Sequence, residues 1–124
     1  MSKTTENLNR SAANGRRSTC ISYGGTLYTS GVTTTDLAGD ITAQAENVLA
    51  QLDTLLAAYG TDKHQVLMAH IFLADMQDYA AFNAVWDTWV DDGFEPCRCV
   101  VQAGLPLPEY RVKIALTAAT ITDR

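Results

Sequence analysis

Arg98 stands out because it lies within a run of residues that is otherwise suited to burial. The segment 96–101 reads Pro-Cys-Arg-Cys-Val-Val. An isolated guanidinium is costly to remove from water, so a buried arginine needs a fixed anionic partner. Its planar fork matches a carboxylate through two parallel hydrogen bonds. Arg98 is therefore a candidate anchor for a carboxylate ligand. The alternatives are a structural ion pair with an Asp or Glu, or an edge position that leaves the side chain in solvent.

The other reactive side chains do not form a metal or nucleophile site. Cys97 and Cys99 are two residues apart, but the chain has no second cysteine pair and only two histidines, so a tetrahedral metal site is not expected. Ser30 has no evident His and Asp partners for a catalytic triad. His70 lies in the middle of an apolar stretch, where a core or interface role is favoured. The odd number of cysteines indicates reduced thiols in the cytoplasm, packed as small hydrophobic groups.

The composition is that of one folded domain. The chain has 124 residues, of which 47% are hydrophobic, and a net charge of -5, which excludes disorder over most of its length and disfavours a general nucleic-acid binder. No apolar run is long enough to span a membrane, and residues 1–17 lack the apolar region of a signal peptide. We expect a flexible N-terminal tail over residues 1–17 and one domain over residues 18–124.

Residue patterns predict five strands and two helices. The Gly24-Gly25 pair between β-favouring runs indicates a tight hairpin. Asp40 is suited to begin a helix and Gly60 to end it. Apolar residues recur at three-and-four spacing within each predicted helix. The expected elements are strands at 18–23, 26–30, 66–73, 97–103 and 110–120, and helices at 41–59 and 77–90.

The resulting order, β-β-α-β-α-β-β, predicts a single α/β (α+β) domain with both helices on one face of a mixed sheet. Crossover connections between parallel strands are nearly always right-handed, which places both helices on the same side. The other face of the sheet still carries Val, Ile, Leu and Cys side chains, and no element remains to cover it. A second copy of the chain would remove this apolar face from water, so we predict a homo-oligomer.

Residues 26–118 resemble the RidA family, also called YjgF or L-PSP-like proteins, and most closely its YoaB-like branch. No single stretch is diagnostic, but four stretches occur in the family's order and with nearly its spacing. They are Leu-Tyr-Thr-Ser-Gly at 27–31, Ile-Phe-Leu-Ala-Asp at 71–75, Asn-Ala-Val-Trp at 83–86, and Pro-Cys-Arg-Cys-Val-Val-Gln-Ala-Gly-Leu at 96–105.

The resemblance implies a chorismate mutase-like fold, assembled as a homotrimer with its sites in the clefts between subunits. Active members hydrolyse reactive enamines and imines to 2-keto acids and ammonia, without a cofactor or metal. By position in these motifs, Arg98 would hold the substrate carboxylate, with Cys99 beside it. Ser30 and Gly31 would shape the pocket, and Asn83 would lie at its edge.

Three positions depart from the family's pattern. The deaminases hold the attacking water with a Glu fifteen residues after the arginine, whereas this count gives Lys113, and Ala115 two residues further is not acidic either. A tyrosine at the pocket entrance corresponds loosely to Arg17, and a cysteine two residues after the arginine corresponds to Val100. The carboxylate anchor is therefore retained and the acid is replaced by a cation.

Lys113 would face Arg98 if the last two strands formed an antiparallel pair around residues 105–106. Two cations in one cleft favour an anion, including a doubly charged one, and each disfavours the protonation of the other. Lys113 would then be a candidate base with a lowered pKa. The alternative is a strand residue that points into solvent.

The sequence leaves three hypotheses for function. The first is a cofactor-free enamine/imine deaminase that holds its ligand's carboxylate at Arg98. The second is a non-catalytic binder of keto acids or dicarboxylates that has lost the acid. The third, ribonuclease or translation inhibitor, is ranked last because the chain is acidic and lacks a His-based acid/base pair.

Overall fold

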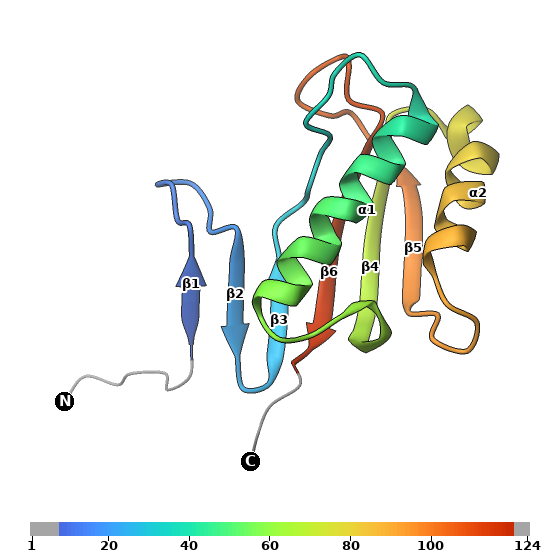
Figure 1. Ribbon diagram of the computed structural model, residues 1–124. Coiled ribbons are helices and arrows are strands. Elements are labelled where there is room, and N and C mark those ends of the chain that lie inside the picture. Colours follow the sequence, from blue (N-terminus) through green and yellow to red (C-terminus); the bar gives the residue numbers. More distant parts are fainter. Residues whose placement is uncertain (1–7, 121–124) are drawn as a thin grey trace.

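The computed structural model describes residues 8–120, which form one mixed sheet with two helices on one of its faces (Figure 1). The single-domain α+β architecture predicted from the sequence is confirmed for these residues. The strands are β1 Asn9–Ser11, β2 Cys20–Tyr23, β3 Thr26–Thr29, β4 Val66–Leu73, β5 Cys97–Gln102 and β6 Val112–Ala119. The helices are α1 Ile41–Ala58 and α2 Tyr79–Trp89, with short 3-10 turns η1 Lys63–Gln65 and η2 Met76–Asp78.

The predicted hairpin is formed by β2 and β3, which pair antiparallel with Tyr23 opposite Thr26. Gly24 and Gly25 have φ angles of 58° and 87°. Side chains are disfavoured at such positive φ values, so this two-residue turn favours glycine at both positions. The hairpin fixes the point at which the chain leaves β3 and reaches Ser30 and Gly31.

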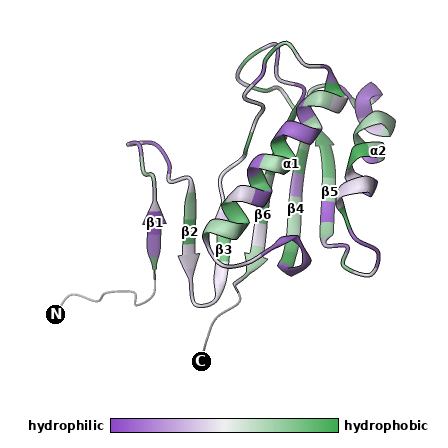
Figure 2. Ribbon diagram, viewed as in Figure 1, coloured by the Kyte–Doolittle hydropathy of each residue, from purple (hydrophilic) through white to green (hydrophobic). Residues whose placement is uncertain are grey.

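Helix α1 begins where the sequence predicts and ends one residue earlier. The carboxylate of Asp40 accepts a hydrogen bond of 2.9 Å from the backbone N–H of Ala43, and Gly60 adopts a φ of 71° after the last turn. One side of α1 packs on the sheet through buried residues that include Val48, Leu52 and Leu56. Figure 2 shows hydrophobic and hydrophilic residues interspersed along both helices, as expected for helices with one face against a sheet.

Helix α2 starts two residues later than predicted, because the chain first makes the η2 turn. Asp78 ends this turn, and its carboxylate accepts hydrogen bonds of 3.0 and 2.9 Å from the guanidinium of Arg111. Phe82 and Trp86 are the buried residues of α2. This ion pair fastens the start of α2 to the segment that leads into β6.

The sheet order is β1-β2-β3-β6-β4-β5, which corrects one prediction. The last two strands do not pair with each other. Strand β4 lies between them, running parallel to β5 and antiparallel to β6. The segment 103–111 is therefore a connection that passes over β4 rather than a hairpin turn. As a result, β5 is an edge strand in the described part of the chain.

The N-terminal region also differs from the prediction. A tail without structure was expected over residues 1–17, but Asn9–Ser11 form β1, which pairs antiparallel with β2. Residues 1–7 of the expected tail lie outside the described residues. The three residues of β1 carry polar side chains, so no apolar pattern marks them as a strand. They are held by backbone pairing with an existing hairpin.

The helix-free face of the sheet carries apolar side chains that no described element covers. Residues in β6 alternate between buried and half-buried, so Ile114 and Leu116 face the helices while Lys113 and Ala115 face the opposite side. We call this opposite side the open face. It includes Tyr28 and Val101, which are 47% and 44% exposed. The predicted uncovered face is therefore present in residues 8–120.

Two absences hold for residues 8–120. No helix there has the length and apolarity needed to cross a membrane. No group of three or more His, Cys, Asp or Glu side chains in this part of the chain is arranged to hold a metal ion.

Gln44 is the buried polar group that links α1 to the connection before β6. It is 1% exposed, and its amide donates to the carbonyls of Gly39 and Glu109 and accepts from the N–H of Arg111. We expect Gln44→Ala to lower the free energy of unfolding by about 2–4 kcal/mol, because it leaves buried backbone groups without partners. Urea denaturation at fixed protein concentration measures this change. The exposed Gln77→Ala is the control, and an equal midpoint for the two variants would contradict the assignment.

Candidate functional site

Arg98 lies on the helix side of β5 and its side chain packs against α2. In the parallel β4–β5 register it is level with Ala69, a core residue that faces the helices. The guanidinium carbon lies 5.4 Å from the ring centre of Trp86, a cation–π contact. Its Nη1 atom is buried and makes no hydrogen bond, and no carboxylate in residues 8–120 forms an ion pair with Arg98. The structural ion pair considered as an alternative is therefore absent from this part of the chain.

Asn83 adds a second unpartnered polar atom on α2. Its Oδ1 is buried and has no hydrogen-bond donor. Asn83 and Trp86 are three residues apart in α2, so their side chains lie on the same side of the helix. Buried polar groups are nearly always satisfied, so each of these two atoms needs a partner that residues 8–120 do not supply. The partner of Arg98 Nη1 would accept a hydrogen bond, and the partner of Asn83 Oδ1 would donate one.

The loop that delivers Arg98 to its position is fixed to the start of β4. His64 Nε2 lies 2.6 Å from Asp91 Oδ2, and the His64 ring stacks on Phe94 at 3.9 Å. The hydrogen bond from His64 holds the pKa of the Asp91 carboxyl below its ordinary value. These contacts hold the connection between α2 and β5.

Ser30 and Gly31 follow β3, which is separated from the Arg98 strand β5 by β6 and β4. Ser30 Oγ donates to the carbonyl of Ser18 at 2.5 Å, and Val32 forms an antiparallel bridge with Ile114 of β6. A Cβ on Gly31 would lie 2.3 Å from Cε of Lys113. The aliphatic chain of Lys113 therefore lies directly against Gly31, and a larger residue at position 31 would have to displace it.

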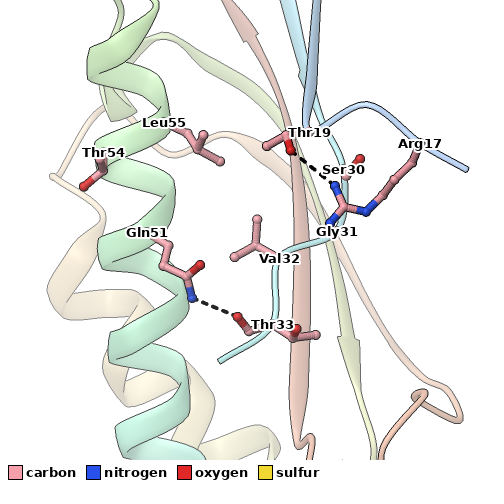
Figure 3. A pocket seen from close by; sticks show the side chains of 9 residues that line it. All are labelled: Arg17, Thr19, Ser30, Gly31, Val32, Thr33, Gln51, Thr54 and Leu55. Carbon is pink, nitrogen blue, oxygen red and sulfur yellow. Dashed lines mark hydrogen bonds between the residues drawn. The ribbon is translucent and has the colours of Figure 1, made fainter. Parts of the chain in front are cut away.

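A cavity of about 430 Å³ opens beside these residues (Figure 3). Arg17, Ser30 and Gly31 lie along one side of it and side chains of α1 along the other. The Arg17 guanidinium contacts Thr19 Oγ1 at 3.4 Å. The volume falls within the usual range for small-molecule sites. The lining consists of Arg17, Thr19, Ser30, Gly31, Val32, Thr33, Gln51, Thr54 and Leu55, and contains no acidic residue.

A larger cavity, of about 690 Å³, lies between α1 and α2. Its lining includes Glu46, Asp53 and Trp89, and the Asp53 carboxylate accepts the Trp89 indole N–H at 3.0 Å. None of the residues predicted from the sequence to bind a ligand lines this cavity. The predicted site residues are found instead on edge strand β5 with α2, and near the middle strands β3 and β6.

The predicted site residues fall into two groups that one protomer does not bring together. Strands β6 and β4 separate the Ser30–Gly31 segment from β5, which at three strand spacings is about 14 Å. The expectation that Arg98 and Lys113 face one another is wrong within a chain, because Lys113 lies on the open face and Arg98 on the helix side. Cys99 also lies on the open face, whereas Val100 shares the side of Arg98.

Trp86 is a site residue that the sequence marks only as the last member of the Asn-Ala-Val-Trp stretch at 83–86. It is 5% exposed and does pack in the core against Phe82. Its ring also supports the guanidinium of Arg98. The sequence does show that Asn83 and Trp86 are one helical turn apart and share a side of the helix. It does not show that β5, with Arg98, packs against that side.

Comparisons with known proteins agree with this architecture. The family model described as Endoribonuclease L-PSP matches residues 7–120. The RutC family protein YoaB from Escherichia coli K12 is 46% identical over 107 residues, covering 86% of this chain and 93% of YoaB. A crystal structure of a YjgF family member from Neisseria meningitidis superposes with a TM-score of 0.91 at 38% identity, covering 97% of this chain and all of the other.

A protein of the conserved Rid family from Yersinia pestis is more distant, with a TM-score of 0.80 at 28% identity over 87% of this chain and 90% of the other. The match to the family model spans every described residue, including both groups of site residues. The chain therefore belongs to the RidA/YjgF family, the family of Endoribonuclease L-PSP, and within it to the YoaB-like branch.

Proposed function

We propose that this protein is a cofactor-free deaminase that hydrolyses reactive 2-imino acids to 2-keto acids and ammonia. Water adds to the C=N carbon, the nitrogen takes up protons, and the C–N bond breaks to leave a keto group and ammonia. An enamino acid such as 2-aminoacrylate enters the same reaction through its imino tautomer. The three free cysteines fit the reducing cytoplasm, where we place the protein.

The observation that carries the proposal is the unsatisfied guanidinium of Arg98. Its Nη1 is buried without a partner, and its face is already occupied by Trp86. A carboxylate would form charge-assisted hydrogen bonds with the edge of the guanidinium that remains free. Asn83 Oδ1, also buried and unpartnered, suits the N–H of the substrate's imine or amine. A 2-imino acid carries both groups on adjacent carbons.

The site is proposed to form between neighbouring protomers of a homotrimer. The open face needs a cover, and edge strand β5 is free to approach another chain. A neighbouring Ser30–Gly31 segment next to Arg98 would join the two groups of site residues. Closed symmetry then gives one such site at each interface.

Hydrolysis must proceed here without the Glu that holds water in the family's deaminases. By its spacing from Arg98, that Glu would correspond to Lys113 or Ala115. Both residues lie on the open face. An imine carbon is already electrophilic in water. Holding the substrate in a fixed orientation contributes several kcal/mol by itself, so positioning is the main catalytic contribution expected of this site.

The proposal is tested by generating 2-aminoacrylate enzymatically in the presence of the purified protein. We expect 2-keto acid to appear faster than in the buffer control, in proportion to protein concentration. Absence of any acceleration by a correctly assembled protein would refute the deaminase assignment.

The missing acid favours a second candidate, a non-catalytic binder of keto acids or dicarboxylates. Saturable binding without turnover would support it. Lys113→Glu and Ala115→Glu each place a carboxylate on the open face near Gly31, and appearance of activity in either variant would also favour the binder. RNA cleavage that disappears in Arg98→Ala would instead support the ribonuclease function that the family description names.

A further inference from the structure

Two cations flank the Ser30–Gly31 segment. Lys113 lies against Gly31 on the open face, and Arg17 lines the cavity on the helix side. Neither Lys113 nor Arg17 forms an ion pair with any carboxylate in residues 8–120. Lys113 is half-buried, and its aliphatic chain lies against Gly31.

Within residues 8–120, no acidic group lines the cavity beside this segment or lies level with Lys113 on β4 or β5. The cavity beside it contains no Asp or Glu in its lining. In the register of the sheet, Lys113 is level with Phe72 of β4 and Val101 of β5, neither of which is charged. This local excess of positive charge contrasts with the net charge of -5 for the whole chain. The segment is electrostatically suited to an anion.

The backbone at Gly31 supplies a further donor. The N–H of Ser30 donates to Thr19 and that of Val32 donates to Ile114, both within the fold. The N–H of Gly31 between them has no acceptor among the described residues. A backbone N–H beside an unpaired ammonium is a favourable arrangement for a carboxylate.

We infer that the Ser30–Gly31–Lys113 group binds a second carboxylate, so that the preferred substrates are 2-imino dicarboxylic acids. The inference rests on the proposed function, in which Arg98 of one protomer and Gly31 of another form one site. Arg98 holds the carboxylate next to the imine carbon. Lys113 then pairs with the carboxylate at the far end of the substrate.

The charge of residue 113 decides this preference. An acid near Gly31 would repel a second carboxylate and favour a substrate with a neutral side chain. A lysine attracts the second carboxylate and leaves a neutral side chain without a partner. The specificity is therefore measured by the ratio of kcat/KM for dicarboxylic imines to kcat/KM for monocarboxylic imines. This ratio reports the difference in transition-state binding between the two classes.

The experiment compares imines of similar length generated in place by amino-acid oxidases. Imines from aspartate and glutamate are the dicarboxylic probes, and those from 2-aminobutyrate and norvaline are the monocarboxylic ones. We expect kcat/KM to be at least about tenfold higher for the dicarboxylic class in the unmodified protein. Lys113→Met should remove most of this preference, and Lys113→Gln, which keeps a polar group, should do the same.

Arg10→Met is the matched control, because it removes one positive charge at an exposed position on β1. It should leave the ratio unchanged. Equal kcat/KM for both classes, or a ratio that Lys113→Met does not alter, would overturn the inference and leave the deaminase assignment standing.

Binding gives a readout that does not need turnover. The dissociation constants of 2-oxoglutarate and 2-oxopentanoate are measured by calorimetry on the same variants. Tighter binding of 2-oxoglutarate that is lost in Lys113→Met supports the second carboxylate site even if neither imine is hydrolysed. Equal affinities overturn it.

Discussion

Arg98→Met is expected to lower kcat/KM for imine hydrolysis by about 100-fold or more, because it leaves a buried carboxylate without its cation. Methionine keeps much of the apolar stem that lies against Trp86. The substitution weakens both the binding of the substrate and its orientation. We therefore expect KM to rise and kcat to fall. Steady-state kinetics with enzymatically generated 2-aminoacrylate provides the measurement.

Arg98→Lys is the informative control for this substitution. It retains the positive charge but replaces a planar fork with a single ammonium, so a bidentate contact is lost. We expect activity between that of the unmodified protein and that of Arg98→Met. An Arg98→Met protein that assembles normally and keeps its full kcat/KM would contradict the role of this arginine.

Trp86→Ala is expected to lower the free energy of unfolding by about 3–5 kcal/mol, because it removes a large buried side chain. Trp86 is 5% exposed and packs against Phe82 and Trp89. The same change removes the ring under Arg98, so the guanidinium loses its support. Denaturant unfolding at fixed protein concentration measures the stability, and kinetics on the folded protein measures the second effect.

Trp86→Phe and Trp86→Leu separate packing from support of the guanidinium. Phenylalanine keeps an aromatic face, whereas leucine fills part of the volume without one. We expect the Leu variant to have a higher KM than the Phe variant. Equal KM values in these two variants would show that Trp86 contributes packing alone.

The local elements were predictable because their residues carry local signals. Helix α1 has a capping Asp40, a terminating Gly60 and a single apolar stripe, and its bounds differ from the prediction by one residue. Strand β4 matches its predicted range, since eight consecutive residues rich in strand formers are too short for a typical helix. The Gly24-Gly25 turn set the register of β2 and β3.

The pairing of β6 was not predictable from the residues that surround it. Strands that are adjacent in sequence often pair, and two prolines between β5 and β6 suggest a turn. In the fold β6 lies between β3 and β4, in contacts that join residues far apart in the chain. Strand β1 was missed for a different reason, because its pairing uses only backbone groups of a polar segment.

The sequence predicted which residue types form the candidate site, but it did not predict how they are arranged in space. A single arginine within an apolar run identified Arg98 as a group in need of an anion. The same sequence could not show that Arg98 and Lys113 lie on opposite sides of the sheet, because that depends on the order of three strands. The structure therefore changes the interpretation from one cleft with two cations to two partial sites.

Mixing two inactive variants tests the central claim, that each site combines Arg98 of one protomer with Gly31 of another. Arg98→Met protein and Gly31→Val protein are each expected to be nearly inactive, the second because a branched side chain would displace Lys113 and occupy the space in which the Ser30–Gly31 segment meets Arg98 of the neighbouring protomer. After co-expression in equal amounts, random assembly leaves about a quarter of the sites with both native residues. We predict that imine hydrolysis recovers to about that fraction of the unmodified activity. Mixed oligomers that stay as inactive as the separate variants would contradict a site shared between protomers.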